Sequence, residues 1–165
     1  YYRFNSNIRI NQFSIGKDKY KYEGGMVNFD EPSIDQISNY AFLYLNTPYL
    51  WGGRTPFGID CSGFTQMVYR MCGFALPRDS HEQADEGELV ELLEEADEGD
   101  LAFFTAKTDK ISHVGIILSG NQSGKKQIIH ASGKVRVDDL DEQGIFNREI
   151  GDYSHSLIKI KKIIV

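Results

Sequence analysis

Apolar positions in the first half of the chain recur at the spacing of helices. They fall three or four residues apart at Ile34, Ile37, Tyr40, Ala41, Tyr44 and Leu45, which is the spacing of one helix face. We expect this helix to begin at Asp30 or Ser33. It should end at residues 46–48, because a residue that precedes proline disfavours helical geometry.

Two further helices are expected after a glycine-rich, aromatic loop. One runs from about Cys61 to Cys72, where Gly73 ends it. A short helix opens at Asp79 or Ser80, since both residue types are favoured at helix N-caps. We interpret the acidic run that follows, over residues 82–100, as a solvated face that leads into the first strand of the domain.

The second half of the chain changes to short apolar runs that are typical of strands. Turn-forming residues separate these runs, which occupy residues 100–104, 113–118, 126–131, 134–137 and 157–165. Strands that follow one another at hairpin spacing form antiparallel sheets. Helices followed by such strands predict an α+β domain in which the helices pack on an antiparallel β-sheet. We assign this domain to residues 29–165.

The residues before this domain form a separate, β-rich segment. Residues 7–15 and 20–22 have the pattern of two strands, with a turn at residues 16–19. A two-stranded hairpin is marginal alone, so we expect residues 1–28 to pack on the rest or to be the end of an upstream domain. The chain starts at Tyr1 without a charged-then-apolar leader, and we interpret it as a processed or trimmed piece.

Composition excludes several classes of protein. The chain has 165 residues, is 41% hydrophobic and carries a formal net charge of -6. This length corresponds to one main domain that buries roughly 70% of its unfolded surface, and the apolar content is too high for a disordered chain. The acidic balance argues against nucleic acid as a partner. No apolar run is long enough to span a membrane, and two cysteines cannot form a disulfide framework.

Cys61 is the strongest candidate for chemistry. It follows the glycine-rich loop and stands in the expected first turn of a helix, between Asp60 and Ser62 and just before Gly63. The positive end of a helix dipole and free backbone N–H groups lower a thiol pKa, which favours a nucleophilic thiolate. The alternative is a buried structural cysteine. Cys72, about 16 Å further along a continuous helix, is too distant for a disulfide and is assigned to the core.

His113 and His130 are the next candidates, each within an apolar strand pattern. Because a hairpin over residues 119–127 would make their strands adjacent, they can lie together beside Cys61. A helix N-terminal cysteine that faces histidines on a sheet is the arrangement of papain-like catalysis. Satisfied core histidines are one alternative. A zinc site of Cys61, His113 and His130, with Asp60 as an optional fourth ligand, is another, although the short paired-ligand spacing of structural zinc sites is absent.

Other residues near the loop carry weaker signals. Tyr49 can place its hydroxyl in a cleft or simply pack on the core, which is what we expect of Trp51. The loop has glycines but lacks the spacing and the Gly-Lys-Ser/Thr end of a phosphate loop, so we do not expect nucleotide binding. His81 and His155 are interpreted as surface residues.

These residues together resemble a known family. The stretches are "TPYLWGGRTPFGIDCSGFTQMVYRMCG", "LPRDSHEQ", "GDLAFF", "ISHVGIIL" and "IIHASG". They resemble the NlpC-type cell-wall cysteine peptidases of bacteria, from about Asp30 to Val165. The resemblance implies a compact papain-like fold. It assigns the nucleophile to Cys61, the general base to His113, the residue that orients this base to His130, and part of the oxyanion hole to Tyr49.

The resemblance also implies the substrate. Family members cut peptidoglycan stem peptides, and this chain is most similar to γ-D-glutamyl-L-diamino acid endopeptidases that prefer a free N-terminal L-Ala. In those enzymes the residue that matches Asp79 pairs with the L-Ala ammonium, and those that match Ser62 and Ser80 hold the D-Glu carboxylate. We add Asp60 and Arg78 to the substrate-binding set, although Arg78 can equally brace the loop. No metal or organic cofactor is expected.

Some alternatives remain open at this point. Such enzymes usually carry upstream bacterial SH3-like domains that restrict the cleft, and residues 1–28 resemble at most the last strands of one. The same triad can cut another amide, such as the muramoyl–L-Ala bond, or transfer an acyl group. A wall-binding module without turnover is the alternative outside enzymes. Stem peptides as partners imply the bacterial cell envelope, with cytoplasmic recycling of murein peptides as the second location.

Overall fold

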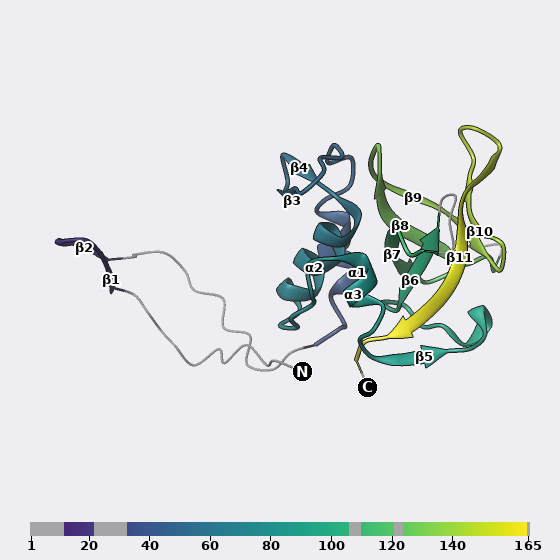
Figure 1. Cartoon of the computed structure of the whole chain (residues 1–165), viewed down its shortest axis with the longest axis horizontal. Coiled ribbons are helices and arrows are strands. Elements are labelled where there is room, and N and C mark those ends of the chain that lie inside the picture. The colour runs from purple at the N-terminus through teal and green to yellow at the C-terminus, as the bar shows by residue number, and fades with distance from the viewer. Residues whose placement is uncertain (1–11, 22–32, 106–109, 121–123, 165) are drawn as a thin grey trace.

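The computed structural model describes residues 12–21, 33–105, 110–120 and 124–164. Three helices lie on one side of the molecule and most strands on the other (Figure 1). The helices are α1 (Ile37–Phe42), α2 (Cys61–Met71) and α3 (Ser80–Gln83). At the N-terminus, β1 (Gln12–Ile15) pairs antiparallel with β2 (Asp18–Lys21). Most of residues 1–28 lies outside the described residues, so the assignment of that segment stays a prediction.

The helices follow the sequence pattern with one difference. As expected, α2 begins at Cys61 and α3 at Ser80. The first helix begins at Ile37 and not at Ser33, because residues 34–36 form a turn in which the Ile37 N–H bonds three residues back to Ile34, and Asp30 lies outside the described residues. It also ends early, because after Phe42 the backbone N–H groups again bond three residues back and the chain tightens into turns. Asn46 then adopts a positive φ of 67°, which ends the turns and directs its N–H to the carbonyl of Val135 at 2.9 Å.

The strands of the second half form one seven-stranded sheet in the order β10-β9-β8-β7-β6-β11-β5. They are β5 (Glu88–Val90), β6 (Leu101–Thr105), β7 (His113–Leu118), β8 (Gln127–Ser132), β9 (Lys134–Asp141), β10 (Gly144–Asn147) and β11 (Asp152–Lys162). Each pairing is antiparallel, as expected. The sequence pattern did not reveal β5, β10, the 3₁₀ turn η1 (Leu93–Glu95), or the small hairpin of β3 (Arg54–Thr55) and β4 (Gly58–Ile59).

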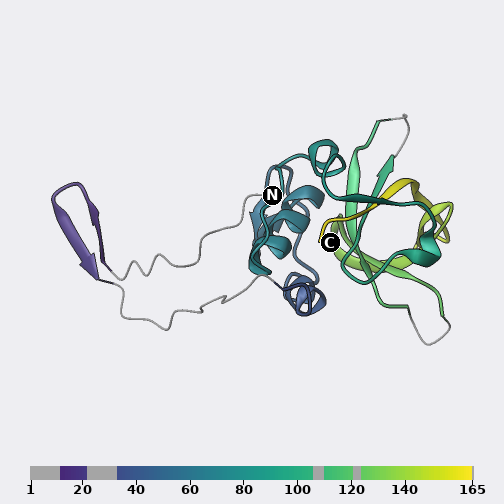
Figure 2. The ribbon, with the colours of Figure 1, turned by 90° about the horizontal axis from the view of Figure 1, so that it is seen from below.

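The sheet closes on itself, which the sequence did not predict. Strand β10 pairs with β9 on one side and with β11 on the other. The strands from β6 to β11 therefore form a closed barrel, with β5 added outside on β11. Figure 2 shows these strands curving round beside the helices. Closure removes the unpaired edges that an open sheet would expose.

Two apolar cores follow from this closure, because successive side chains of a strand point to opposite faces. The first core joins the helices to the outside of the barrel and includes Ile37, Phe64, Val68, Tyr69, Phe103, Val114, Ile116 and Ile129. The second takes residues from all barrel strands and fills the interior with Ala102, Phe104, Ile117, Ile128, Leu140, Ile145 and Ile160. His113 and His130 have the alternation of the interior set, so they stand at one end of the barrel lumen.

The β10–β11 junction depends on a glycine. Gly144 has a φ of 140°, and a Cβ there would lie 1.9 Å from the carbonyl oxygen of His155. We expect Gly144→Ala to lower the free energy of unfolding by about 3 kcal/mol, from backbone strain and overpacking together. Chemical denaturation measures this. Gly151→Ala is the matched control, because Gly151 also has a positive φ (68°) but open space around it. It should cost only about 1 kcal/mol, and equal losses would contradict the steric argument.

Candidate active site

Cys61 is held at the start of α2 by its neighbour Asp60. The Asp60 carboxylate caps the helix by accepting the N–H of Gly63 at 2.7 Å, and it also accepts the N–H of Gly52 at 2.8 Å. Only glycine fits at position 63, because a Cβ there would lie 2.4 Å from the carbonyl oxygen of Gly53. The glycine-rich loop therefore packs closely against the N-terminal end of α2.

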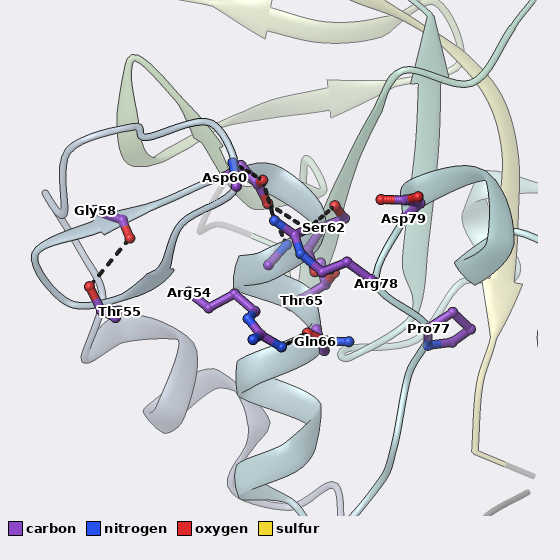
Figure 3. Close-up of polar contacts among 12 residues, drawn as sticks. Arg54, Thr55, Gly58, Asp60, Ser62, Thr65, Gln66, Pro77, Arg78 and Asp79 are labelled. Carbon is purple, nitrogen blue, oxygen red and sulfur yellow. Dashed lines mark hydrogen bonds and ion pairs between the residues drawn. The ribbon is translucent and has the colours of Figure 1, made fainter.

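Arg78 also bonds to Asp60 (Figure 3). We call Asp60, Arg78 and the groups that they bind the clamp. The Arg78 guanidinium donates to Asp60 Oδ1 at 3.0 Å, to Asp60 Oδ2 at 2.5 Å and to Ser62 Oγ at 2.9 Å. Asp60 thus accepts four hydrogen bonds, which fills the capacity of a carboxylate. Burial would raise the pKa of Asp60, but the bonds from Arg78, Gly63 and Gly52 hold it below its ordinary value. The contacts favour the bracing interpretation of Arg78, and they leave Asp60 no free lone pair for a ligand.

Gln83 anchors the segment that carries Arg78, Asp79 and Ser80. It is fully buried at the end of α3, where its amide oxygen accepts the hydroxyl of Thr65 at 2.7 Å. Its amide nitrogen donates to the carbonyls of Ser62 at 3.0 Å and Pro77 at 2.9 Å. The sequence analysis missed this residue, since a glutamine in a polar helix carries no periodic signal.

Asp79 and Ser80 lie at the rim of this clamp. Asp79 is exposed beside Arg78 (Figure 3), and its charge helps to raise the pKa of that guanidinium, after the larger effect of Asp60. Its backbone N–H donates to the Glu82 carboxylate at 3.4 Å, so α3 is capped while the Asp79 carboxylate remains at the surface. Ser80 is half-buried as the first residue of α3.

The two histidines lie together, as their expected strands implied. Strands β7 and β8 pair with Gly115 opposite His130, and this register brings His113 Nε2 to 2.8 Å from His130 Nδ1. Both rings are buried. The chain of contacts continues from His130 Nε2 to Asp138 Oδ2 at 3.0 Å. Asp138 on β9 was not among the expected site residues, because one acidic residue in a strand has no distinguishing pattern.

His155 corrects an expectation. Interpreted as a surface residue from the sequence, it is half-buried on β11, and its ring stacks on that of His113 with centroids 4.1 Å apart and planes at 21°. The strand pairings cause this, because β11 lies beside β6 and Phe104 of β6 lies opposite His113 at the start of β7. His155 itself lies opposite Ile145 of β10, in the pairing that closes the barrel. Burial lowers the pKa of His155 to about 4, so the stacked ring is neutral at physiological pH. His81 is exposed, as expected. Trp51, which was expected to pack on the core, is 83% exposed, so that expectation was wrong.

Tyr49 lies beside the cysteine. Its N–H donates to the carbonyl of Gly133 at 2.9 Å, and its backbone forms a bridge with Ile59. The pKa of its phenol is raised first by burial and then by the charges of Cys61 and Asp60. The hydroxyl therefore stays protonated at neutral pH and is able to donate a hydrogen bond near the sulfur.

Comparison with known proteins agrees with this geometry. Residues 46–153 match the NlpC/P60 family. The chain belongs to the NlpC/P60 family. The γ-D-glutamyl-L-lysine dipeptidyl-peptidase of Bacillus subtilis (strain 168) is 42% identical over 98 residues, which are 58% of this chain and 33% of that protein. Dipeptidyl-peptidase 6 of Lysinibacillus sphaericus is 35% identical over 121 residues, or 70% of this chain and 40% of its own.

Solved structures give the same fold. An NLP/P60 family protein of Staphylococcus aureus subsp. aureus Mu50, described as similar to a lipoprotein, superimposes with a TM-score of 0.63 at 31% identity. The alignment covers 88% of this chain and 46% of that one. An NlpC/P60 protein of Bacillus cereus ATCC 10987 gives 0.65 at 27% identity, over 90% and 45% of the two chains. This chain spans about a third of the length of the first curated relatives it matches.

The pKa of Cys61 in this NlpC/P60 domain is raised, whereas the sequence analysis expected it to be lowered. Burial, and then the negative charge of Asp60, raise the pKa of the Cys61 thiol above its ordinary value. Backbone N–H groups of Val114, Ser62 and Cys61 lower it again, but by less. The predicted lowering by the helix N-terminus is therefore outweighed, and the thiol is protonated at rest. Burial also lowers the pKa of His113 well below 6.5, so this imidazole is neutral.

A neutral thiol beside a neutral imidazole needs proton transfer to react. The Val114 N–H reaches the sulfur of Cys61, and Val114 directly follows His113 in β7. Nε2 of His113 is engaged by His130 Nδ1 at 2.8 Å. The atom available to accept a proton is therefore Nδ1.

Other features of the domain complete the picture. Cys72 is buried and free, as expected, and burial raises its pKa to about 11. Across residues 12–21, 33–105, 110–120 and 124–164, no group of three or more His, Cys, Asp or Glu side chains could hold a metal ion. None of the described helices has the length and apolar character to cross a bilayer.

The stacked ring of His155 can be tested by titration. We expect His155→Ala to raise the pKa of His113 toward 6.5, because burial is the main cause of the lowered value and this change opens one face of the ring to water. NMR titration of the imidazole signals measures the shift. His81→Ala is the matched control and should leave His113 unchanged, since His81 is exposed. A His113 pKa that does not move in His155→Ala would contradict this explanation.

The clamp of Arg78 is testable through stability. Arg78→Lys removes the bidentate contact with Asp60 and the bond to Ser62. We expect the free energy of unfolding to fall by about 1–3 kcal/mol at neutral pH. The folded-state pKa of Asp60 is lowered, so the loss should shrink as the pH falls through it and the carboxylate is protonated in both proteins. Arg54→Lys, with one long 3.4 Å contact to Gln66, is the control.

Proposed function

We propose that this chain is a cysteine endopeptidase that hydrolyses the γ-D-glutamyl–L-diamino acid amide bond of peptidoglycan stem peptides. The observation that carries the proposal is the buried His113–His130 pair, 2.8 Å apart, next in the chain to Val114, whose N–H reaches the sulfur of Cys61 at the start of α2. The names of the similar B. subtilis and B. cereus proteins, γ-D-glutamyl-L-lysine dipeptidyl-peptidases, support the choice of bond.

In the first step the Cys61 sulfur attacks the γ-carbonyl carbon of D-Glu. As the S–C bond forms, the thiol proton passes to Nδ1 of His113, because both groups are neutral at rest. His130 accepts the Nε2–H of His113 and keeps the ring oriented. Proton transfer during attack is general-base catalysis, and it does not require a thiolate in the free enzyme.

The tetrahedral intermediate then collapses. The C–N bond breaks, and the imidazolium of His113 gives its proton to the departing amine of the diamino acid. A thioester between Cys61 and the γ-carboxyl of D-Glu remains. Water attacks this thioester with Nδ1 of His113 as base, the C–S bond breaks, and the thiol regains a proton. Water is the only co-reactant.

The oxyanion of the intermediate needs hydrogen-bond donors. We assign the hydroxyl of Tyr49 and the backbone N–H of Cys61 to this task. The raised pKa of Tyr49, caused first by burial, supports the assignment because a protonated phenol is a donor. A donor of this kind contributes about 100-fold or more in rate.

Recognition of the peptide is assigned to the rim of the clamp. The exposed carboxylate of Asp79 would pair with the ammonium of a free N-terminal L-Ala. Ser62 and Ser80 would donate to the α-carboxylate of D-Glu. In support, Ser62 Oγ already accepts a hydrogen bond from Arg78, which leaves its own O–H free to donate. Asp60 and Arg78 would act by holding these residues in place.

Other functions of the same site give different products. A muramoyl–L-alanine amidase would release L-Ala peptides from muramic acid, and an acyl transferase would pass the acyl group to an amine. A wall-binding module would bind peptide without turnover. Mass spectrometry separates the three. Because the proposed substrate belongs to the bacterial cell wall, we place the enzyme in the cell envelope or outside the cell, with murein-peptide recycling in the cytoplasm as the second candidate.

The proposal is tested with two synthetic peptides. We expect cleavage of L-Ala-γ-D-Glu-L-Lys or its meso-diaminopimelate counterpart to give L-Ala-D-Glu, and much slower cleavage of the N-acetylated peptide, which lacks the ammonium for Asp79. Cys61→Ala should abolish turnover, while Cys72→Ala, a change of the buried core cysteine, should retain it. Liquid chromatography with mass spectrometry follows the products.

Three results would count against the proposal. If neither the free nor the acetylated peptide is cut, the substrate is wrong. Equal rates on the two peptides would remove the role of Asp79. Full activity in Cys61→Ala would reject the mechanism.

A further inference from the structure

A buried carboxylate stands at the end of the histidine chain inside the barrel. We infer that Asp138 is a positioning residue that dictates which nitrogen of His130, and through it of His113, carries the proton. The result is that Nδ1 of His113 is left as the base. This inference rests on the proposed function, in which that nitrogen accepts the proton of Cys61.

Asp138 is held as an ionised acceptor by Arg136. The guanidinium contacts both carboxylate oxygens, with Nε at 2.7 Å from Oδ2 and Nη2 at 2.9 Å from Oδ1. Burial would raise the pKa of this carboxyl, but the hydrogen bonds from His130 and Arg136 keep it below the ordinary value. The geometry alone gives the same result, because a guanidinium only donates and a bidentate partner must therefore accept at both oxygens.

An ionised carboxylate fixes the tautomer of His130. Since Asp138 can only accept, the 3.0 Å contact to His130 Nε2 must be an N–H that points at Asp138 Oδ2. Burial lowers the pKa of His130 despite this contact, so the ring is neutral and carries one proton. With that proton on Nε2, its Nδ1 is an acceptor.

The tautomer of His130 in turn fixes the tautomer of His113. Nδ1 of His130 accepts, so the 2.8 Å contact to His113 Nε2 must be donated by His113. His113 is neutral as well, and its single proton is thereby assigned to Nε2. Its Nδ1 then has a free lone pair. The proton positions of two rings follow from one carboxylate, in the way that the aspartate of a serine protease triad fixes its single histidine.

Arg136 and its partners hold the Asp138 carboxylate in one orientation and balance its charge. Arg136 balances the negative charge, so the carboxylate acts on the rings through hydrogen-bond direction and adds no net charge. The other donors of Arg136 bond to Glu149 at 2.8 Å and to Asn147 at 3.0 Å. These contacts join β9 to β10 and its following turn at one end of the barrel, which fixes Arg136 and hence the carboxylate plane.

The next residue provides a matched comparison. Asp139 is adjacent in β9, so its side chain points to the opposite face of the strand. It forms an ion pair with Arg148 at 2.7 Å, and Arg148 is 64% exposed. Asp139 thus resembles Asp138 in residue type, strand and arginine partner, but its hydrogen bonds go to Arg148 and not to the histidines.

The first test is direct observation of the tautomers in the unaltered protein. We expect ¹⁵N NMR of labelled histidines at neutral pH to give both His113 and His130 a protonated Nε2 and a bare Nδ1. A bare Nε2 on His113 would overturn the inference. This measurement needs no substrate and no variant, so it stands whatever the protein is found to hydrolyse.

The second test changes the carboxylate to an amide of the same shape. The amide nitrogen of Asn can donate, so in Asp138→Asn the protons of His130 and His113 can move to their other ring nitrogens. The same amide nitrogen, placed where a carboxylate oxygen stood, also faces an N–H of Arg136 that it cannot accept. We expect a population of His113 with its proton on Nδ1, and a fall in kcat of roughly 100-fold with little change in KM. Asp139→Asn should retain the tautomers and the rate.

The outcomes separate this inference from the proposed function. Wild-type tautomers and wild-type kcat in Asp138→Asn would overturn the inference, even if the peptide substrate is correct. An equal loss of activity in Asp139→Asn would reduce Asp138 to a general stability effect and also overturn it. If the unaltered protein cuts neither peptide, the proposed function fails while the tautomer prediction is still decided by NMR.

Discussion

The pairing of β10 with β11 is the constraint on which the site depends. It turns a row of hairpins into a closed barrel, and closure creates an interior at whose end polar side chains from four strands meet. His113, His130, Asp138 and His155 come from β7, β8, β9 and β11. In an open sheet β11 would not be held to β10, and one face of the histidine chain would be open to water. The backbone around Gly144 is thus linked to the protonation of a ring on another strand.

A second constraint acts on the cysteine from outside the barrel. Asp60 uses all its accepting capacity on Gly52, Gly63 and Arg78, so one carboxylate joins the glycine-rich loop, the helix start and the segment before α3. Burial is the main cause of the raised pKa of Cys61, and the charge of Asp60 raises it further, so the residue that positions the thiol also helps to keep it protonated. Position and protonation state are therefore set together.

Sequence patterns predicted the parts of this protein that are local. The start of α2 at Cys61, the strand pair of His113 and His130, and the NlpC/P60 relationship all followed from spacing and motifs. Barrel closure did not, because β10 is only four residues long and has no clear alternation. Asp138 and His155 were missed for the same reason: their roles arise from contacts across strands, and neither residue stands in a motif. The pKa of Cys61 was misjudged because the helix terminus was considered without the burial and the carboxylate that accompany it.

The protonated state of Cys61 also has a consequence for the oxidation of its sulfur. Peroxides and disulfides react with thiolates, and a thiol that keeps its proton reacts with them slowly. In the proposed mechanism Cys61 becomes nucleophilic only while its proton moves to His113, so the sulfur would be spared oxidation between turnovers. The burial that keeps the sulfur protonated would thus also slow its oxidation.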